Sequence, residues 1–312
     1  MPLTDAGSAG FRPWPPETGR RGLLASTLVL AVAVAACGAE PQRNQQPSAP
    51  PAPTEGVTVV EKLVLPFDAY KATPKQQATL GNAHNRLVVA CMRKHDITVT
   101  PPTEDPKTLA AIDPGNSRRY GVTDIEAART HGYHLARPAS PDTTEAWAAN
   151  LPEQTRDRLY GTSADRGCLD QASLSLEKGA RKADWPWLAK QDSASLEQSA
   201  KNPEVVAAVK RWRECMSKAG HDYVSPEMAI GDTRWTLDKP EVGAPEKRAA
   251  TDDTTCKWSS GLVLTWYAAD SELQQKVIDE NPSRFAAFKA NLKHRLQRAS
   301  AVLAADEGRE VR

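Results

Sequence analysis

Four cysteines constrain the fold of this chain more than any other feature, because each bond between two of them would tie distant segments together. They are Cys91, Cys168, Cys215 and Cys256, and four cysteines can be joined in three ways. Cys91 and Cys215 have similar surroundings. Each is followed by Met, one variable residue and Lys, then by a His-Asp pair and a proline, with the His-Asp pair shifted by two residues in the second copy. This repeat indicates a duplicated unit.

The residues before each repeated motif predict a helix. Thr73-Pro74-Lys75-Gln76 supplies an N-cap, a proline at the first helical position and a capping-box glutamine, and Asn202-Pro203 starts the second copy in the same way. Gly220 is expected in the left-handed conformation that ends a helix, and Asp96 stands near the corresponding place in the first copy. Apolar residues follow at helical spacing, namely Leu80, Ala83, Leu87 and Cys91, then Val205, Val209, Trp212 and Met216.

The start of the chain is typical of an export leader. A largely apolar run from Leu23 to Ala36 follows positive charge, ends in small residues and falls short of the roughly 20 residues that a spanning helix needs. The run ends in Val34-Ala35-Ala36-Cys37, which resembles the lipobox of bacterial lipoproteins. That resemblance implies cleavage before Cys37 and lipid attachment to it. Arg20-Arg21 also resembles a twin-arginine signal, but the general secretory route stays open.

Composition separates the leader from the rest of the chain. The leader and the whole chain each carry a net charge of +1, so the mature part is neutral and gives no reason to expect nucleic-acid binding. The segment after Cys37 is polar and proline-rich, and is expected to be disordered. We therefore predict a signal peptide (1–36), an anchor and tether (37–56), and the two halves of one helical domain (57–200 and 201–312).

An exported chain meets an oxidising compartment, where an even number of cysteines favours disulfide bonds. A duplicated helix–loop–helix unit would join the first cysteine of each copy to the second. Leucines stand six and eight residues after both Cys168 and Cys256, which supports the equivalence of the second cysteines. The predicted bonds are Cys91–Cys168 and Cys215–Cys256, each worth about 4 kcal/mol in the chain-entropy model.

Several stretches resemble a group of actinobacterial lipoproteins with no established activity. They are Cys91-Met92, the segment from Arg119 to His134, Cys215-Met216, and the segment from Cys256 to Trp266. The resemblance implies a secreted, cysteine-paired helical domain, and it supplies no catalytic residues.

The remaining patterns predict a mainly α fold with little β. Val57–Leu65 is the best strand candidate. Capping boxes are expected at Thr123/Glu126 and at Asp142/Glu145. A long helical stretch is expected from Cys256 toward Asp279, and another helix after Asn281-Pro282. Its apolar stripe indicates core and consists of Phe285, Phe288, Leu292, Leu296, Ala299 and Leu303.

No catalytic or cofactor motif stands out, so we predict no catalytic residue, no metal and no cofactor. His131 and His134 could share a metal, but Gly132 separates them and further ligands are not evident, which favours a packed turn. Asp252-Asp253 could act as acid and base, although a solvated helix face is the plainer interpretation. Most tryptophans are expected in the core, with Trp185 and Trp187 in a loop where they could bind a partner.

These features predict a lipoprotein on the extracytoplasmic face of the cell membrane, anchored through Cys37. Its helical domain is expected to be a non-catalytic binding or scaffold module with an envelope protein or ligand as partner. The alternatives are an extracytoplasmic hydrolase acting on envelope polymers and a solute-binding lipoprotein of an importer. Importer lipoproteins show alternating strand–helix units, and these are not evident here.

Overall fold

The computed structural model describes residues 63–113, 115–135, 147–148 and 151–310. The described residues do not include the predicted signal peptide, the predicted lipid-attachment residue Cys37, the predicted tether or the predicted Asp142/Glu145 cap. Nor do they include most of the expected strand Val57–Leu65. Its last three residues, from Leu63, are described and are not part of a strand.

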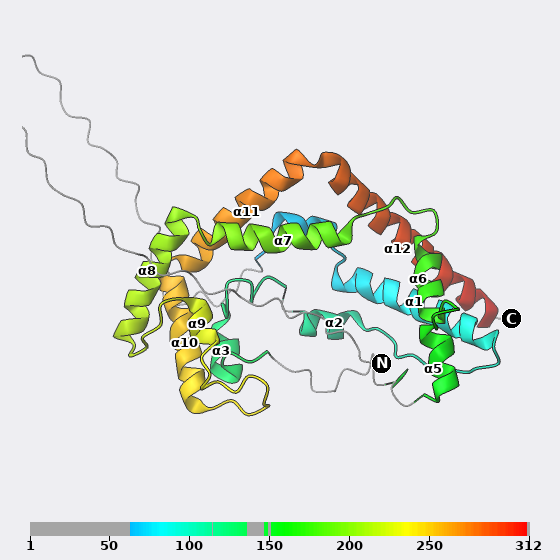
Figure 1. Ribbon diagram of the computed structural model, residues 1–312, viewed down its shortest axis with the longest axis horizontal. Helices are drawn as coiled ribbons and strands as arrows, with labels where there is room; N and C mark the ends of the chain where they lie inside the picture. Colours follow the sequence, from blue (N-terminus) through cyan, green and yellow to red (C-terminus); the bar gives the residue numbers. More distant parts are fainter. Residues whose placement is uncertain (1–62, 114, 136–146, 149–150, 311–312) are drawn as a thin grey trace, which may run out of the picture. The chain divides into compact units, whose positions relative to one another are not determined.

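The described chain is mainly helical, as predicted (Figure 1). Within the described ranges it forms no strand, and its β pairing is limited to two isolated bridges, at Arg119–Gly121 and Gly161–Arg166. The elements are a 3-10 helix η1 (Pro66–Tyr70) and the α-helices α1 (Pro74–Arg93), α2 (Pro106–Ile112), α3 (Ile125–His131), α5 (Glu153–Tyr160), α6 (Cys168–Glu177), α7 (Trp185–Ser199), α8 (Pro203–Lys218), α9 (Pro226–Ile230), α10 (Ala244–Ser259), α11 (Leu262–Glu280) and α12 (Pro282–Glu310).

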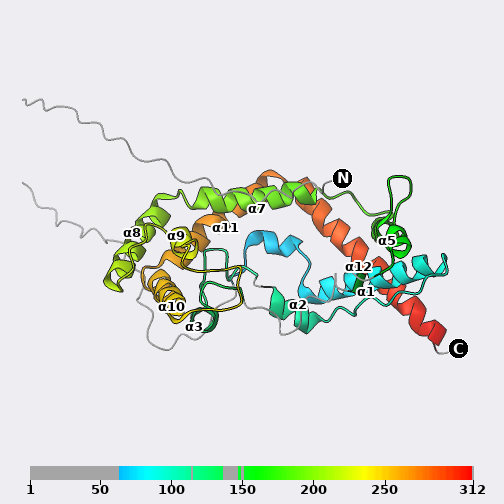
Figure 2. The same cartoon turned by 60° about the horizontal axis from the view of Figure 1, so that its bottom comes forward.

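The largest hydrophobic core lies where α3, α8, α9, α10 and α11 meet, and it contains Trp212, Trp235 and Trp266. Smaller clusters join α1 to α5 and α6, η1 to α7 and α12, and α1 to α6 and α12. Helix α7 packs along α11, and α1 packs against both α6 and α12 (Figure 2). No helix in the described ranges combines the length and the apolar character needed to cross a bilayer.

Within the described residues, the predicted helix starts are confirmed with one correction. Thr73 and Gln76 form the capping box of α1, and the Asn202 side chain caps α8. The cap of α3 is Asp124, whose carboxylate accepts from the Glu126 and Ala127 amides. Thr123 was expected there, but it is buried and its hydroxyl donates to the Ser117 carbonyl instead.

Helices α1 and α8, which carry the first cysteine of each half, end alike. The Ile97 amide donates to the Met92 carbonyl over 3.1 Å, and the His221 amide donates to the Met216 carbonyl over 2.9 Å. The residue before each donor has positive φ, +60° at Asp96 and +88° at Gly220. Both ends are therefore the same left-handed turn, so Asp96 and Gly220 are equivalent positions.

The correspondence continues along a constant offset of 124 residues. Val88 matches Trp212, Met92 matches Met216 and Val99 matches Tyr223, and all six side chains are buried. The helical repeat around the first cysteine of each half is thus present in three dimensions.

The second cysteines differ in position. Cys168 is the first residue of α6, whereas Cys256 lies three residues before the end of α10. Gly261, with φ +75°, then breaks the long helix expected after Cys256 into α10 and α11.

The tryptophans at 185 and 187 are not in a loop, contrary to expectation. They lie in the first turn of α7, and both are half-buried. Their rings pack on α12, with the Trp185 centroid 4.9 Å from that of Phe288 and the Trp187 centroid 5.8 Å from that of Phe285. The predicted stripe of α12 is core at Phe285, Phe288 and Ala299.

Candidate functional site

The most unusual chemistry in the largest core is a fully buried ion pair in α10. Asp253 and Lys257 are one helical turn apart, both side chains have 0% exposure, and Nζ lies 2.6 Å from Oδ2. The Trp212 indole of α8 donates to the other carboxylate oxygen over 2.9 Å. Both oxygens of Asp253 therefore have partners within the core.

The backbone before α3 completes the surroundings of this pair. The Lys257 ammonium also donates to the Val122 carbonyl over 3.4 Å. A Cβ at Gly121, where φ is +82°, would come within 2.6 Å of Nζ, so this glycine leaves room for the ammonium. The interpretation of Asp252-Asp253 as a solvated pair was wrong for Asp253, because the carboxylate lies on the inner face of α10.

Burial shifts the proton affinities around this pair. Loss of solvation raises the pKa of Asp253 above its ordinary range, although Lys257 and the Trp212 indole oppose the shift. Burial, with the charge of Asp253, also raises the pKa of Tyr133. The Tyr133 hydroxyl is buried and makes no hydrogen bond of ordinary geometry.

A second buried network joins the segment before α3 to α7 and α11. Arg119 donates to Asp270, whose side chain has 0% exposure, and also pairs with Asp192 over 2.9 Å. The Tyr120 hydroxyl donates to Asp270 over 3.0 Å, and Gln274 donates to Asp192 over 3.2 Å. These contacts hold the segment before α3, helix α7 and helix α11 together, and the charged groups are paired with one another.

The histidines near Gly132 are not arranged as a metal centre. His134 is buried, with Nδ1 2.8 Å from Glu246 and Nε2 3.0 Å from the Lys239 carbonyl. His131 lies at the end of α3 and is only half-buried. The packed turn expected from the sequence is thus observed, with Tyr133 and His134 in its core.

Both predicted disulfide bonds are present. Cys91–Cys168 and Cys215–Cys256 join residues 77 and 41 positions apart, with Cα–Cα distances of 5.7 and 5.6 Å. The first bond ties α1 to α6, and the second ties α8 to α10.

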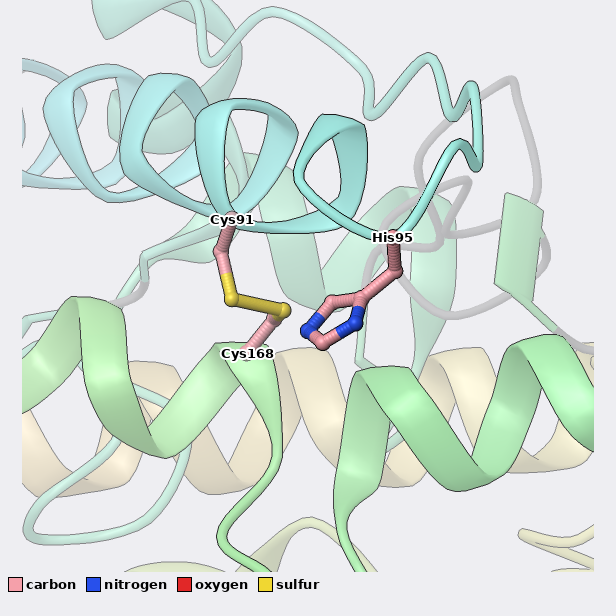
Figure 3. A group of neighbouring side chains, drawn as sticks. All are labelled: Cys91, His95 and Cys168. Carbon is pink, nitrogen blue, oxygen red and sulfur yellow. A yellow bond between two sulfur atoms is a disulfide. The ribbon is translucent and has the colours of Figure 1, made fainter.

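His95 lies beside the first bond. A ring nitrogen lies within 4.8 Å of both sulfurs, and Figure 3 shows the imidazole turned toward them. Cys91 and Cys168 are buried, whereas His95 is exposed. The same three side chains could hold a soft metal only after the bond is reduced, because metal ligation needs thiolates.

Two hollows of the described surface have cationic side chains among their lining residues. One lies between α3 and α10 and is lined by Arg129, Lys247, Arg248, Thr251 and Asp252. In the same region His221 lies 2.9 Å from Asp252. The other lies along α12, where Lys289 and Lys293 flank Leu292 and Leu296.

Sequence reasoning missed Lys257 and Arg119. The signal for Lys257 was its position four residues after Asp253, with Ala249, Ala250 and Cys256 on the same helix. Arg119 gave no such signal, because its partners are 73 and 151 residues away in sequence.

Comparisons with models of protein families, with curated proteins and with solved structures find no match for this chain. The resemblance to actinobacterial lipoproteins therefore stays a prediction.

Proposed function

We propose that this chain is a lipid-anchored protein of the extracytoplasmic face of the cell membrane, whose helical domain is a non-catalytic binding or scaffold module of the envelope. The leader and the lipobox-like sequence ending in Cys37 support the anchor. The resemblance to actinobacterial lipoproteins supports the same placement. Two disulfide bonds in the domain are in keeping with an oxidising compartment.

One observation favours a module over an enzyme. Burial raises the pKa of the Asp253 carboxyl group. A raised carboxyl pKa is a common property of catalytic acids. The Asp253 side chain is nevertheless sealed from solvent, and both oxygens are bonded to residues of the core. A substrate could not reach it without opening the domain, so its role is to hold α8 and α10 together.

The hollow between α3 and α10 supports an anionic partner. Arg129, Lys247 and Arg248 line it with positive charge, and Asp252, which lies 2.9 Å from His221, is its one lining carboxylate. Arg129 also pairs with Glu126 of α3, so Lys247 and Arg248 carry most of the positive charge offered to a partner. Opposite charge on the partner would steer association and set its orientation.

The anchor is tested by replacing Cys37 with Ala in the producing cell. Wild-type protein is expected in the membrane fraction with an acylated mature N-terminus, detected by mass spectrometry, because two acyl chains hold a protein stably at a bilayer. The Cys37→Ala variant is expected to lose both properties. Membrane retention of an unacylated variant would contradict the anchor.

The module is tested by sedimentation with purified cell-envelope fragments. Charge reversal to Glu at Arg129, Lys247 and Arg248 is expected to weaken binding at least about tenfold, since several favourable contacts become repulsive. The matched control reverses three exposed lysines of α7, α8 and their connection, Lys190, Lys201 and Lys210, and should leave binding unchanged.

The hydrolase alternative makes a different prediction for His221. If the His221–Asp252 pair were catalytic, His221→Ala would stop release of soluble fragments from the envelope without loss of helicity. Under the proposed function, the wild-type protein releases no such fragments, and His221→Ala still binds the envelope.

A further inference from the structure

The two disulfide bonds start from equivalent cysteines of the helical repeat but have different chemical surroundings. Cys91 and Cys215 lie at equivalent points of the helical repeat, immediately before Met92 and Met216. At the equivalent offset of 124 residues, His95 of the first copy is replaced by Ala219 in the second. An imidazole therefore lies beside the first bond and not at the matching position of the second.

The partner cysteines differ further. Cys168 is the first residue of α6, and its N-cap residue is Gly167, which has no side chain to accept hydrogen bonds from the first turn. The amide dipoles of a helix start stabilise a thiolate and lower the pKa of a cysteine placed there. Cys256 lies in the last turn of α10, where the helix dipole opposes negative charge.

We propose that Cys91–Cys168 is a redox-active disulfide that exchanges with a dithiol, and that Cys215–Cys256 is its structural counterpart. The inference goes beyond the proposed binding function and concerns a different part of the domain.

The geometry assigns a role to each sulfur. Cys91 is 9% exposed and Cys168 is 1% exposed, so an incoming thiolate reaches Cys91 more readily than Cys168. Gln171, which is exposed, has its side-chain oxygen 3.7 Å from the Cys91 sulfur, which places this sulfur near the surface. Cys168 is then the leaving group.

The exchange proceeds in two balanced steps. A thiolate of the dithiol bonds to the Cys91 sulfur, the Cys91–Cys168 bond breaks, and its electron pair goes to Cys168. There the start of α6 and the neighbouring His95 imidazole stabilise the thiolate. The second thiol of the dithiol then loses its proton and attacks the dithiol's own sulfur in the mixed disulfide. That bond breaks and releases Cys91 as a thiolate, so the dithiol leaves oxidised with an internal disulfide. Two electrons and two protons pass from the dithiol to the cysteine pair.

A nearby acid does not cancel this stabilisation. Asp170 lies in the first turn of α6, but its side chain is 72% exposed and pairs with Arg166 over 3.7 Å. Solvent and the pairing with Arg166 both weaken the effect of its charge on the buried sulfur.

The test measures how fast each bond opens in the purified full-length protein. Dithiothreitol is the dithiol, free thiols are alkylated at timed intervals, and the four cysteine peptides are quantified by mass spectrometry. Cys91–Cys168 is expected to open about tenfold faster than Cys215–Cys256, because a leaving thiolate of lower pKa departs faster.

If the exposure of the cysteines alone set the rate, Cys215–Cys256 would open first, so the measured order distinguishes the two explanations. Cys215 is half-buried, whereas Cys91 is buried. If Cys215–Cys256 opened first, or if both bonds opened at one rate through unfolding of the whole domain, the proposal would be overturned.

Variants at the two equivalent positions complete the test. His95→Ala is expected to slow opening of Cys91–Cys168 at least about threefold and to leave Cys215–Cys256 unchanged, which serves as the control within the same molecule. The exposed Ala219, changed to His, is expected to speed opening of Cys215–Cys256. An unchanged rate in His95→Ala, with loss of zinc binding by the reduced protein, would identify a metal site instead and refute the exchange role.

Discussion

Replacement of Lys257 by Met leaves the Asp253 carboxylate buried without its counter-ion. In the folded protein both side chains have 0% exposure, so water can neither screen nor replace the lost ammonium. Removal of one partner of a buried ion pair costs about 3–5 kcal/mol, because the remaining charge stays desolvated. The Trp212 indole still donates to Asp253 and keeps the loss at the lower end of that range.

The magnitude is measurable as a change in melting temperature. For a domain of this size, 1 kcal/mol shifts the midpoint by about 2–4 °C, so Lys257→Met is expected to lower it by about 10 °C. Differential scanning calorimetry with both disulfide bonds intact gives the midpoint, and urea unfolding followed by tryptophan fluorescence gives the free energy of unfolding.

A matched control lies on the next helix. Lys276 and Glu280 of α11 have the same spacing, but their side chains are 69% and 59% exposed and their charged atoms are 3.9 Å apart. Lys276→Met is therefore expected to change the free energy of unfolding by at most about 0.5 kcal/mol.

A double variant separates the lost charge from lost packing. Asp253→Asn with Lys257→Met removes both charges and keeps a carbonyl oxygen for the Trp212 indole. Its stability is expected to return to within about 2 kcal/mol of the wild type. The reasoning is refuted if Lys257→Met alone costs less than about 1 kcal/mol, or if the double variant is no more stable than the single one.

Further expectations concern two buried tyrosines, the second disulfide bond and the turn that ends α8. Tyr133→Phe is expected to leave stability unchanged or raise it, because the hydroxyl has no bonded partner, whereas Tyr120→Phe loses a hydrogen bond to Asp270 and costs about 1–2 kcal/mol in urea unfolding. Burial raises the pKa of both phenols. The contribution of Tyr120 is therefore kept below about pH 10 and is lost only as the pH rises from there toward the folded-state pKa. Because both phenols stay protonated in the folded protein, neither substitution should change its phenolate absorbance near pH 10. Replacement of Cys215 and Cys256 together by Ala is expected to lower the free energy of unfolding by about 4 kcal/mol, and a loss below about 1 kcal/mol would contradict the loop-closure reasoning. Gly220→Ala should cost about 1 kcal/mol through its φ of +88° alone, since no atom lies within 4 Å of the added Cβ; a cost above about 3 kcal/mol would point to a contact that this geometry lacks.

Local signals predicted the helix starts well because each is decided within a few residues. Pro74 with its flanking Thr73 and Gln76, and Pro203 after Asn202, begin α1 and α8 as expected. The predicted cap of α3, Thr123, lies one residue before the observed cap, Asp124. Thr123 and Asp124 are both good caps, and only burial of the Thr123 side chain decided between them.

The buried Asp253–Lys257 pair was harder to predict, because it depends on which face of α10 packs against the core. Asp252 and Asp253 are neighbours in sequence, yet one is partly exposed beside His221 and the other is sealed beside Lys257. The polar composition of α10 gave no clear apolar face from which to choose.

The sequence by itself determined the helical class, the helix boundaries marked by Pro and Gly, and the pairing of the cysteines, because these depend on short-range backbone preferences and on one repeated motif. Only the tertiary structure decided the environment of each charge. It placed Asp253 and Asp270 at 0% exposure, and set Cys168 at a helix start with Cys256 in a last turn. The reason is physical: proton affinity and disulfide reactivity depend on solvation and on dipoles from segments far away in sequence, which no local pattern records.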